Sequence, residues 1–376
     1  MAAALRNAAL LALTAMLWSV VPQAKSSILE KATGLIRPVR DALVRAWPNG
    51  RMRGRETMAA EQPGAATLGA VFGGSSVTSF LGLPPATIAD GAKANIALFG
   101  AGTATPYPAA GAYCAGAPQA IRAGIANWVG ARDHIDFDLG GKILPDGVTA
   151  VDCGDLAIDA NDAPANRAKI TATTKTLLDG GAVPVLLGGD DSVPIPFFQA
   201  FEGRGAFTLL QIDAHIDWRD EVHGIRLGLS SPMRRASEMA WINRIVQVGA
   251  RGLSSARQQE VDDARAAGAT LITAREVAAH GIQAAIDAIP KGADLIITLD
   301  CDGLDPTVIP GVAGRAPGGL SYWQTVELLH GAAQRARIAA FDLVEFVPER
   351  DVQQLGALAA ARLVVNAIGL IARQKS

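Results

Sequence analysis

The chain has 376 residues, of which 49% are hydrophobic and 19% are charged, and its formal net charge is -2. This composition excludes a disordered chain and lacks the basic excess of a nucleic-acid-binding protein. The length allows one large domain or two ordinary ones with a sizeable core. The three cysteines, Cys114, Cys153 and Cys301, are too few and too widely spaced for a disulfide framework or a CxxC zinc site.

The first 60 residues have an unusual composition. One arginine precedes an apolar run from residue 8 to 21, which is similar to the hydrophobic part of a signal peptide and short for a membrane span. An arginine-rich stretch follows over residues 37–55. We interpret residues 1–60 as a leader or extension and residues 61–376 as one folded domain. A cytoplasmic location is expected, with organelle targeting or export as alternatives, and no membrane span is expected elsewhere.

From residue 95 onward, short apolar runs alternate with segments of helical periodicity. In chain order, the pattern predicts a strand at 96–100, a helix beginning near Pro118, a strand at 148–155, a helix at 166–179, and strands at 183–187 and 207–212. It continues with a strand at 245–248, helix 255–267, strand 271–272, helix 277–289, strand 295–299, helix 323–336, strand 338–344 and helix 355–372. Apolar strands alternating with helices are typical of a parallel sheet covered on both faces. We therefore predict an α/β fold with three layers, α/β/α, around a mostly parallel central sheet.

Two acidic clusters come directly after predicted strands, at the edge where parallel sheets bind ligands. They contain Asp213, His215 and Asp217 after the fourth strand, and Asp300 and Asp302 after the seventh. Residues i and i+2 of an extended segment face the same side, so the members of each cluster can converge. Crowded carboxylates repel one another, and divalent cations relieve that repulsion. Single aspartates at strand ends commonly cap helices or form turns, but that reading does not explain the whole set. Carboxylates with one imidazole suit manganese better than zinc or copper.

At these clusters the sequence resembles a known family. The segments DAHID (213–217) and LDCDGLDP (299–306) are similar to two signature motifs of the ureohydrolases, which include arginases, agmatinases and other guanidino-acid hydrolases. Further similar segments follow the family's order: GAYCAGAPQAIR (111–122), VDCGD (151–155), LGGDDS (187–192), PGGLSYWQ (317–324) and FDLVEFVPERD (341–351). The resemblance runs from about residue 95 to the C-terminus and implies an arginase-like fold for the catalytic domain.

The resemblance also implies a site for two Mn²⁺ ions per subunit. A water shared by two cations ionises near neutral pH, and the resulting hydroxide would attack the guanidinium carbon to release urea and a primary amine. The implied ligands are Asp213 and Asp300 bridging both ions, His215 and Asp302 on one ion, and Asp191 and Asp217 on the other.

Three residues have catalytic roles by the same resemblance. Asp217 would accept the proton of the hydroxide and pass it to the leaving amine, which must depart protonated. Glu345 would orient the substrate guanidinium through a charge-assisted hydrogen bond. His223 matches the proton-shuttle histidine of the family.

One position departs from the family pattern. The family usually has histidine after Gly-Gly-Asp, whereas this sequence has Asp191. An aspartate can still bind a hard cation, but five carboxylates would then face two divalent ions. Two interpretations stay open. In a tuned site the extra negative charge raises the pKa of the shared water, and in the alternative the first metal site is weakened.

The favoured function is hydrolysis of a linear guanidino compound such as agmatine, as in polyamine metabolism. Residues 230–236, SSPMRRA, are more similar to the agmatinase type than to the arginase loop. Arg219 would suit a substrate carboxylate and Glu221 a second amine, so a guanidino-acid hydrolase and an arginase stay open. A non-catalytic metal-binding homologue is a further alternative, and Asp191 is the one feature of the sequence that supports it.

A metal-dependent deacetylase is disfavoured because the sequence has no His-His pair. The expected partner is a small guanidino substrate, with no nucleic acid and no membrane. The resemblance implies a homo-oligomer, a trimer or a hexamer.

Overall fold

The structure is a computed structural model that describes residues 79–253 and 256–374. The chain divides into two compact units, residues 1–65 and 66–376, and all the described residues belong to the second unit. The predicted leader over residues 1–60 and its boundary therefore lie outside the described residues.

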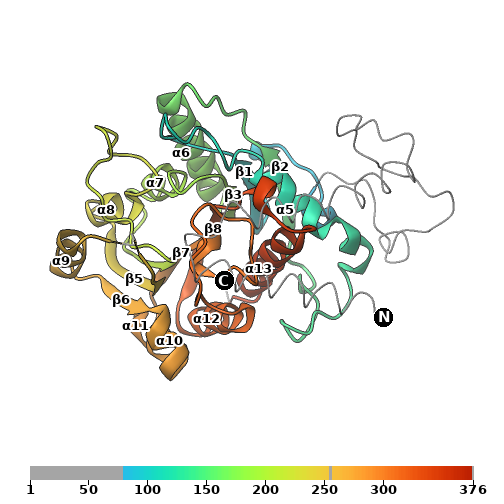
Figure 1. The fold of residues 1–376 in the computed structure, drawn as a ribbon. Coiled ribbons are helices and arrows are strands. Elements are labelled where there is room, and N and C mark those ends of the chain that lie inside the picture. Colours follow the sequence, from blue (N-terminus) through green and yellow to red (C-terminus); the bar gives the residue numbers. More distant parts are fainter. Residues whose placement is uncertain (1–78, 254–255, 375–376) are drawn as a thin grey trace, which may run out of the picture. The chain divides into compact units, whose positions relative to one another are not determined.

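One eight-stranded parallel sheet lies at the centre of the described unit (Figure 1). Its strand order is β2-β1-β3-β8-β7-β4-β5-β6, and each of these strand pairs is parallel. The strands are β1 Ile96–Ala101, β2 Ala150–Asp155, β3 Val183–Gly188, β4 Phe207–Ile212, β5 Ile242–Ala250, β6 Thr270–Thr273, β7 Asp294–Asp300 and β8 Arg337–Val344. The predicted parallel sheet is confirmed.

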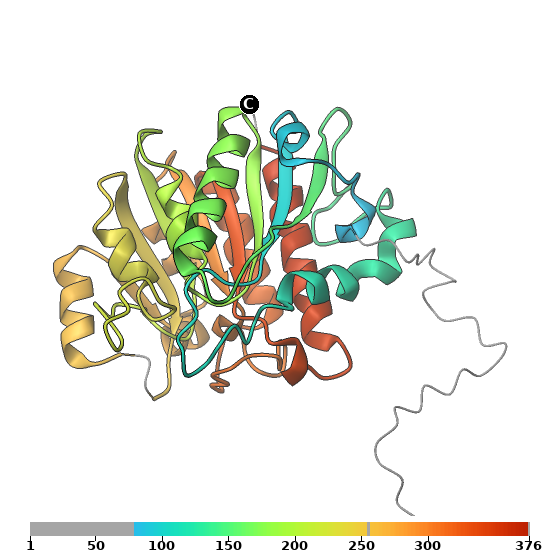
Figure 2. The ribbon, with the colours of Figure 1, turned by 90° about the horizontal axis from the view of Figure 1, so that it is seen from above.

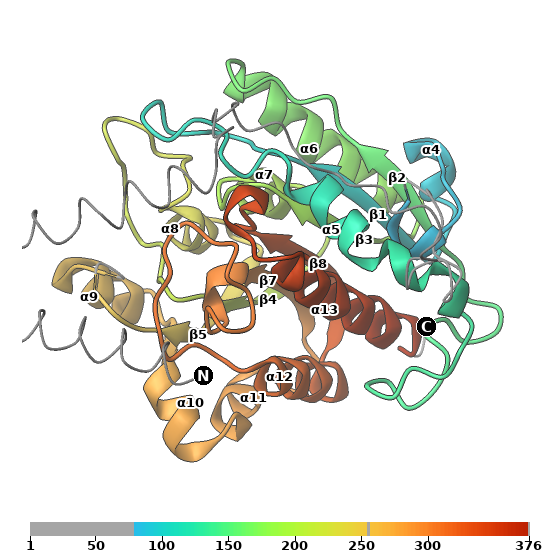
Figure 3. The same cartoon turned by 45° about the vertical axis from the view of Figure 1, so that its right-hand side comes forward.

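The side chains of the strands alternate between two hydrophobic cores, one on each face of the sheet. In β1, Leu98 packs in the first core and Phe99 in the second. In β7, Ile297 packs in the first core and Ile296 in the second. The first face is covered by α5 Ala117–Ile125, α10 Ala274–His280, α11 Gln283–Ala288, α12 Tyr322–Arg335 and α13 Leu355–Ala372. The second face is covered by α4 Ile88–Gly91, α6 Ala163–Asp179, α7 Pro194–Gln199, α8 Pro232–Ser237 and α9 Gln258–Ala266 (Figure 3). The three predicted layers are therefore present.

Helix α13 forms part of the first core. It has the length and mean hydropathy of a membrane span, 1.9, but 78% of that window is buried inside the fold. It packs against α5, where a side chain at Gly124 would meet the backbone of Ala357 at 2.6 Å. The close approach of the two helices requires glycine at this position, and packing accounts for the apolar composition of α13.

Some elements differ from the sequence pattern. The single helix predicted over residues 277–289 is in fact two helices, α10 and α11. Gly281, with a φ of +79°, ends the first of them. The pattern does not predict α7 and α8, because six residues contain too little periodicity to show a helix.

The strand order brings four loops together. Strands β7 and β8 lie between β3 and β4, so the carboxyl ends of β3, β8, β7 and β4 are neighbours. Figure 2 shows the loops that follow the strands gathered along one edge of the sheet, the lower edge in that view. Loops that leave a parallel sheet at a change in strand order commonly form a binding site.

The packing of the sheet gives a first prediction. Ile297 is fully buried in β7, so Ile297→Ala should lower the free energy of unfolding by about 2–5 kcal/mol, through lost burial and the cavity left behind. Phe137→Ala removes a larger side chain, but Phe137 is 93% exposed, so its effect should be close to zero. Urea unfolding of both variants without added metal measures the difference, and equal losses would contradict the described core.

Candidate functional site

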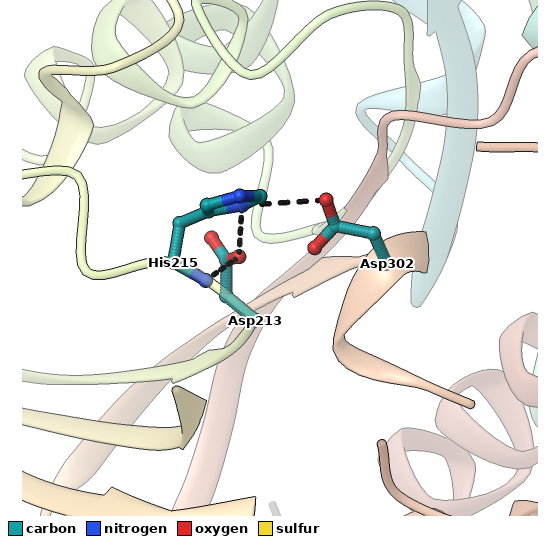
Figure 4. Close-up of side chains that lie close together, drawn as sticks. All are labelled: Asp213, His215 and Asp302. Carbon is teal, nitrogen blue, oxygen red and sulfur yellow. Dashed lines mark hydrogen bonds and ion pairs between the residues drawn. The ribbon is translucent and has the colours of Figure 1, made fainter. Parts of the chain in front are cut away.

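Side chains that could hold metal ions converge at the carboxyl edge of the sheet. Asp213 belongs to two groups, and the potential ligand atoms within each group lie within 4.8 Å of one another. The first group adds His215 and Asp302, and Figure 4 shows the imidazole facing both carboxylates. The second group adds Asp191 and Asp300. Asp213 and Asp300 are therefore close enough to contact one ion, as their predicted roles require.

Short backbone hydrogen bonds fix the ligands that follow β4 and β7. The backbone N–H of His215 donates to Asp213 Oδ1 at 2.6 Å, and the N–H of Asp302 donates to Asp300 Oδ1 at 2.7 Å. Each aspartate thus forms a tight turn with the residue two positions on. These turns, and not extended strands, hold the i, i+2 pairs of the sequence together.

The second group is electrostatically unfavourable without a cation. Burial raises the pKa of Asp191, Asp213 and Asp300 well above the ordinary range, and the neighbouring carboxylates raise it further. In addition, Asp191 Oδ2 is buried and has no hydrogen-bond partner. A cation at this point would reduce the repulsion between the carboxylates and give Asp191 Oδ2 a partner.

The first group contains its own ion pair. Burial raises the pKa of Asp302, but the hydrogen bond and charge of His215 outweigh burial and lower it. For His215, burial lowers the pKa, but its hydrogen bond to Asp302 and the charges of the nearby carboxylates outweigh burial and raise the pKa to about 9. His215 Nδ1 lies 3.3 Å from both Asp213 Oδ1 and Asp302 Oδ2.

Glu345 follows β8 and is buried beside the second group. Its carboxylate accepts hydrogen bonds from the hydroxyl of Tyr113 at 2.7 Å and from the backbone N–H of Asp191 at 2.8 Å. Burial, and then the charge of Asp190, raise its pKa to about 8. Glu345 and Asp217 have φ values of +63° and +49°. Such strained backbone at non-glycine residues clusters at functional sites.

A cavity of about 210 Å³ adjoins these side chains. Six carboxylates line it together with one histidine and one arginine: Asp191, Asp217, Glu260, Asp300, Asp302, Glu345, His215 and Arg219. Tyr113 and Trp218 also line the cavity. The excess of acidic groups suits cationic ligands.

His223 is the one predicted site residue that the structure does not bring to this cluster. It is exposed and does not line the cavity. Val222 and Ile225 exchange backbone hydrogen bonds around it, and His223 and Gly224 both have positive φ, +52° and +80°. Two such residues form a tight hairpin turn, which by itself accounts for the His-Gly sequence. The expected contact of His223 with the reacting groups is therefore not present in this structure.

Two family-like features are structural and lie outside the cluster. Arg122 of α5 is buried, and its Nε donates to Asp152 Oδ2 at 2.7 Å. Its guanidinium also pairs with Asp155, so the VDCGD segment ties β2 to α5. Cys301, between the candidate ligands Asp300 and Asp302, packs in the first core.

Sequence reasoning missed other residues at the site. Tyr113 is separated from Glu345 by 232 positions, and no sequence signal connects the two. Gln211 donates from Nε2 to Asp213 Oδ2 at 2.6 Å and to Asp217 Oδ2 at 2.8 Å. A glutamine between two apolar residues of a strand, two positions before a candidate ligand, was the signal available for Gln211.

Comparisons with known proteins agree with this arrangement. A protein from Thermus thermophilus named N(1)-aminopropylagmatine ureohydrolase is 36% identical over 196 residues, which cover 51% of this chain and 64% of that protein. A protein of the same name from Thermococcus kodakarensis is 28% identical over 287 residues, which cover 75% of this chain and 92% of that protein. The chain thus spans slightly less than two thirds of the Thermus relative.

A solved structure described as a hypothetical agmatinase from Burkholderia thailandensis has the same fold. The TM-score is 0.69 at 24% identity, with 80% of this chain and 92% of that chain covered. The profile of the Arginase family matches residues 94–369, which include all four strands that carry the cluster. The chain therefore belongs to the arginase family.

Proposed function

We propose that the chain hydrolyses a linear guanidino compound such as agmatine to urea and a primary amine. The proposal depends on one observation: two groups that could each hold a metal ion share Asp213, and their other members line the same acidic cavity as Glu345. A guanidinium is a planar cation that pairs well with a carboxylate through charge-assisted hydrogen bonds. The name of the Thermus relative, a ureohydrolase, supports the same reaction.

The residues present fit two divalent cations. Asp191 Oδ2 has no partner, and the surrounding carboxyl groups repel one another. The donors are carboxylate oxygens with a single imidazole, a set that suits Mn²⁺. We therefore propose two Mn²⁺ ions per subunit. One would be held by the group Asp191, Asp213 and Asp300, and the other by the group Asp213, His215 and Asp302. Asp217 would complete the first set and Asp300 the second, since both line the adjoining cavity.

Divalent cations at these residues would supply the nucleophile near neutral pH, because a bound cation lowers the pKa of water. The side chains of the chain do the rest. Glu345 orients the guanidinium, while the Tyr113 hydroxyl and the Asp191 N–H hold the carboxylate of Glu345 in place. Asp217 lines the cavity, where it would accept a proton and transfer it to the leaving amine.

A guanidino acid is the second candidate substrate, and Arg219 favours it. Arg219 lines the cavity, with its Nε 3.7 Å from Glu260 Oε1. The other oxygen of Glu260 accepts the backbone N–H of Arg257 at 2.7 Å. A carboxylate at the far end of the substrate would pair with Arg219, and an ammonium would pair with Glu260. Glu221, the sequence-based candidate for the amine, is exposed and does not line the cavity.

Urea release tests the proposed reaction. With added Mn²⁺, kcat/KM should be highest for agmatine among agmatine, guanidinobutyrate, guanidinopropionate and arginine. A preference for guanidinobutyrate would instead support the second candidate. Release of no urea from any of the four would overturn the proposal and favour a non-catalytic homologue.

Glu345→Gln tests the role of Glu345 in the same assay. The variant should lower kcat/KM about 10- to 100-fold, through loss of a charge-assisted hydrogen bond, and its Mn²⁺ content should be unchanged.

Asp191→His tests the unusual ligand. Removing one negative charge should move the acidic limb of the kcat/KM pH profile to lower pH, because the cations then keep more of their positive charge. Two metal ions per subunit should be retained, as measured by elemental analysis, whereas Asp191→Ala should lose about one. Full activity of the unmodified chain with one tightly bound ion would contradict the two-ion site.

Stability without metal should depend on pH. The folded-state pKa values of Glu345 and His215 are raised, from 4.5 to about 8 and from 6.5 to about 9. The stabilisation that each contributes is complete below its ordinary pKa and is lost as the pH rises through the raised value. The melting temperature of the metal-free chain should therefore fall between pH 5 and pH 9, and Mn²⁺ should raise it more at pH 9 than at pH 5. A metal-free melting temperature independent of pH would contradict this account of the cluster.

A further inference from the structure

Two buried glutamines lie behind the metal-binding carboxylates. Gln211 of β4 and Gln247 of β5 are direct partners in the register of the two strands, and they are 1% and 2% exposed. Each lies between apolar residues of its strand, Leu210 and Ile212 in β4 and Val246 and Val248 in β5. A buried amide is costly unless its donors and acceptors are satisfied, so both residues require specific partners.

The orientation of Gln247 is set by two groups that cannot reverse their roles. The indole Nε1–H of Trp218, which can only donate, donates to Gln247 Oε1 at 2.7 Å. The backbone carbonyl of Ile216, which can only accept, accepts from Gln247 Nε2 at 2.8 Å. Both contacts require the same orientation of the amide. The remaining hydrogen of Gln247 Nε2 is donated to Gln211 Oε1.

The orientation of Gln211 follows from that of Gln247. Because its oxygen accepts the bond from Gln247, its Nε2 must face Asp213 and Asp217, where it donates to one oxygen of each. A reversed Gln211 would place its oxygen against two carboxylate oxygens and lose all three bonds. A single amide nitrogen thus bridges two like charges and sets the distance between them.

We propose that Trp218, Gln247 and Gln211 form a directional hydrogen-bond relay that positions Asp213 and Asp217 to bind metal. Gln211 is the positioning residue that touches the two carboxylates, and Gln247 and Trp218 act through it. The relay extends from the second core, where Trp218 packs, to the acidic cavity. The inference rests on the metal-dependent function proposed above. The further point is that neutral side chains, Gln211, Gln247 and Trp218, determine the positions of the two carboxylates.

Mn²⁺ titration of the full chain, followed by electron paramagnetic resonance, tests the relay without reference to activity. Gln211→Met removes the donor at similar volume and should raise the Kd for Mn²⁺ about 10- to 100-fold, as is usual when a residue that orients metal ligands is lost. Gln247→Met should raise it less, because Gln211 keeps its contacts but loses its fixed orientation. If Gln247 acts through Gln211, the double variant should have the Kd of Gln211→Met alone.

Thr208→Val is the matched control. Thr208 lies on the same strand as Gln211, is 1% exposed and makes no hydrogen bond to the carboxylates. This change should leave the Kd for Mn²⁺ unchanged.

The outcomes separate the relay from the function on which it rests. An unchanged Kd in Gln211→Met, or additive effects in the double variant, would overturn the relay while leaving the metal site intact. If Gln211→Met does not fold, as judged by circular dichroism, an unchanged Kd in Gln247→Met overturns the relay. Failure of the unmodified chain to bind Mn²⁺ would overturn the proposed function and the relay together.

Discussion

Repulsion among buried carboxylates is the interaction on which the site depends. Asp191, Asp213 and Asp300 are buried within reach of one another, and burial first, then the charges of neighbouring carboxylates, raise the pKa of each. A folded chain tolerates such an arrangement when cations compensate the charge or when the groups stay protonated. Metal binding, protonation and folding are therefore linked here, because the same groups take part in all three.

The surrounding structure restrains these charges with neutral or backbone donors. Gln211 bridges Asp213 and Asp217, and the Tyr113 hydroxyl holds Glu345. Amide, hydroxyl and backbone N–H groups orient carboxylates without cancelling their charge, so the charge remains available to cations and to a guanidinium. His215 is a cationic partner inside the cluster, because its bond to Asp302 outweighs burial and raises its pKa. A metal ion at His215 would have to displace that proton.

Much of the fold and the positions of most candidate ligands could be predicted from the sequence. Apolar strands such as 207–212 and 295–299 match β4 and β7 closely, and the acidic clusters after them converge as expected. His223 shows what a local sequence motif cannot predict. A His-Gly pair that matches a family motif also forms an ordinary hairpin turn, and here the His223 side chain is exposed. The leader over residues 1–60, the oligomeric state and the cellular location stay predictions.

The sequence by itself determined the periodicity of the strands and helices, the positions of the acidic clusters and the substitution at Asp191, because these features depend on residues close together in the chain. Only the tertiary structure decided which distant residues meet. The strand order places β8 between β3 and β7, and so brings Glu345 beside Asp191 and Tyr113. The pairing of β4 with β5 likewise aligns Gln211 with Gln247. Contacts of this kind depend on strand order and register, which local sequence patterns do not encode.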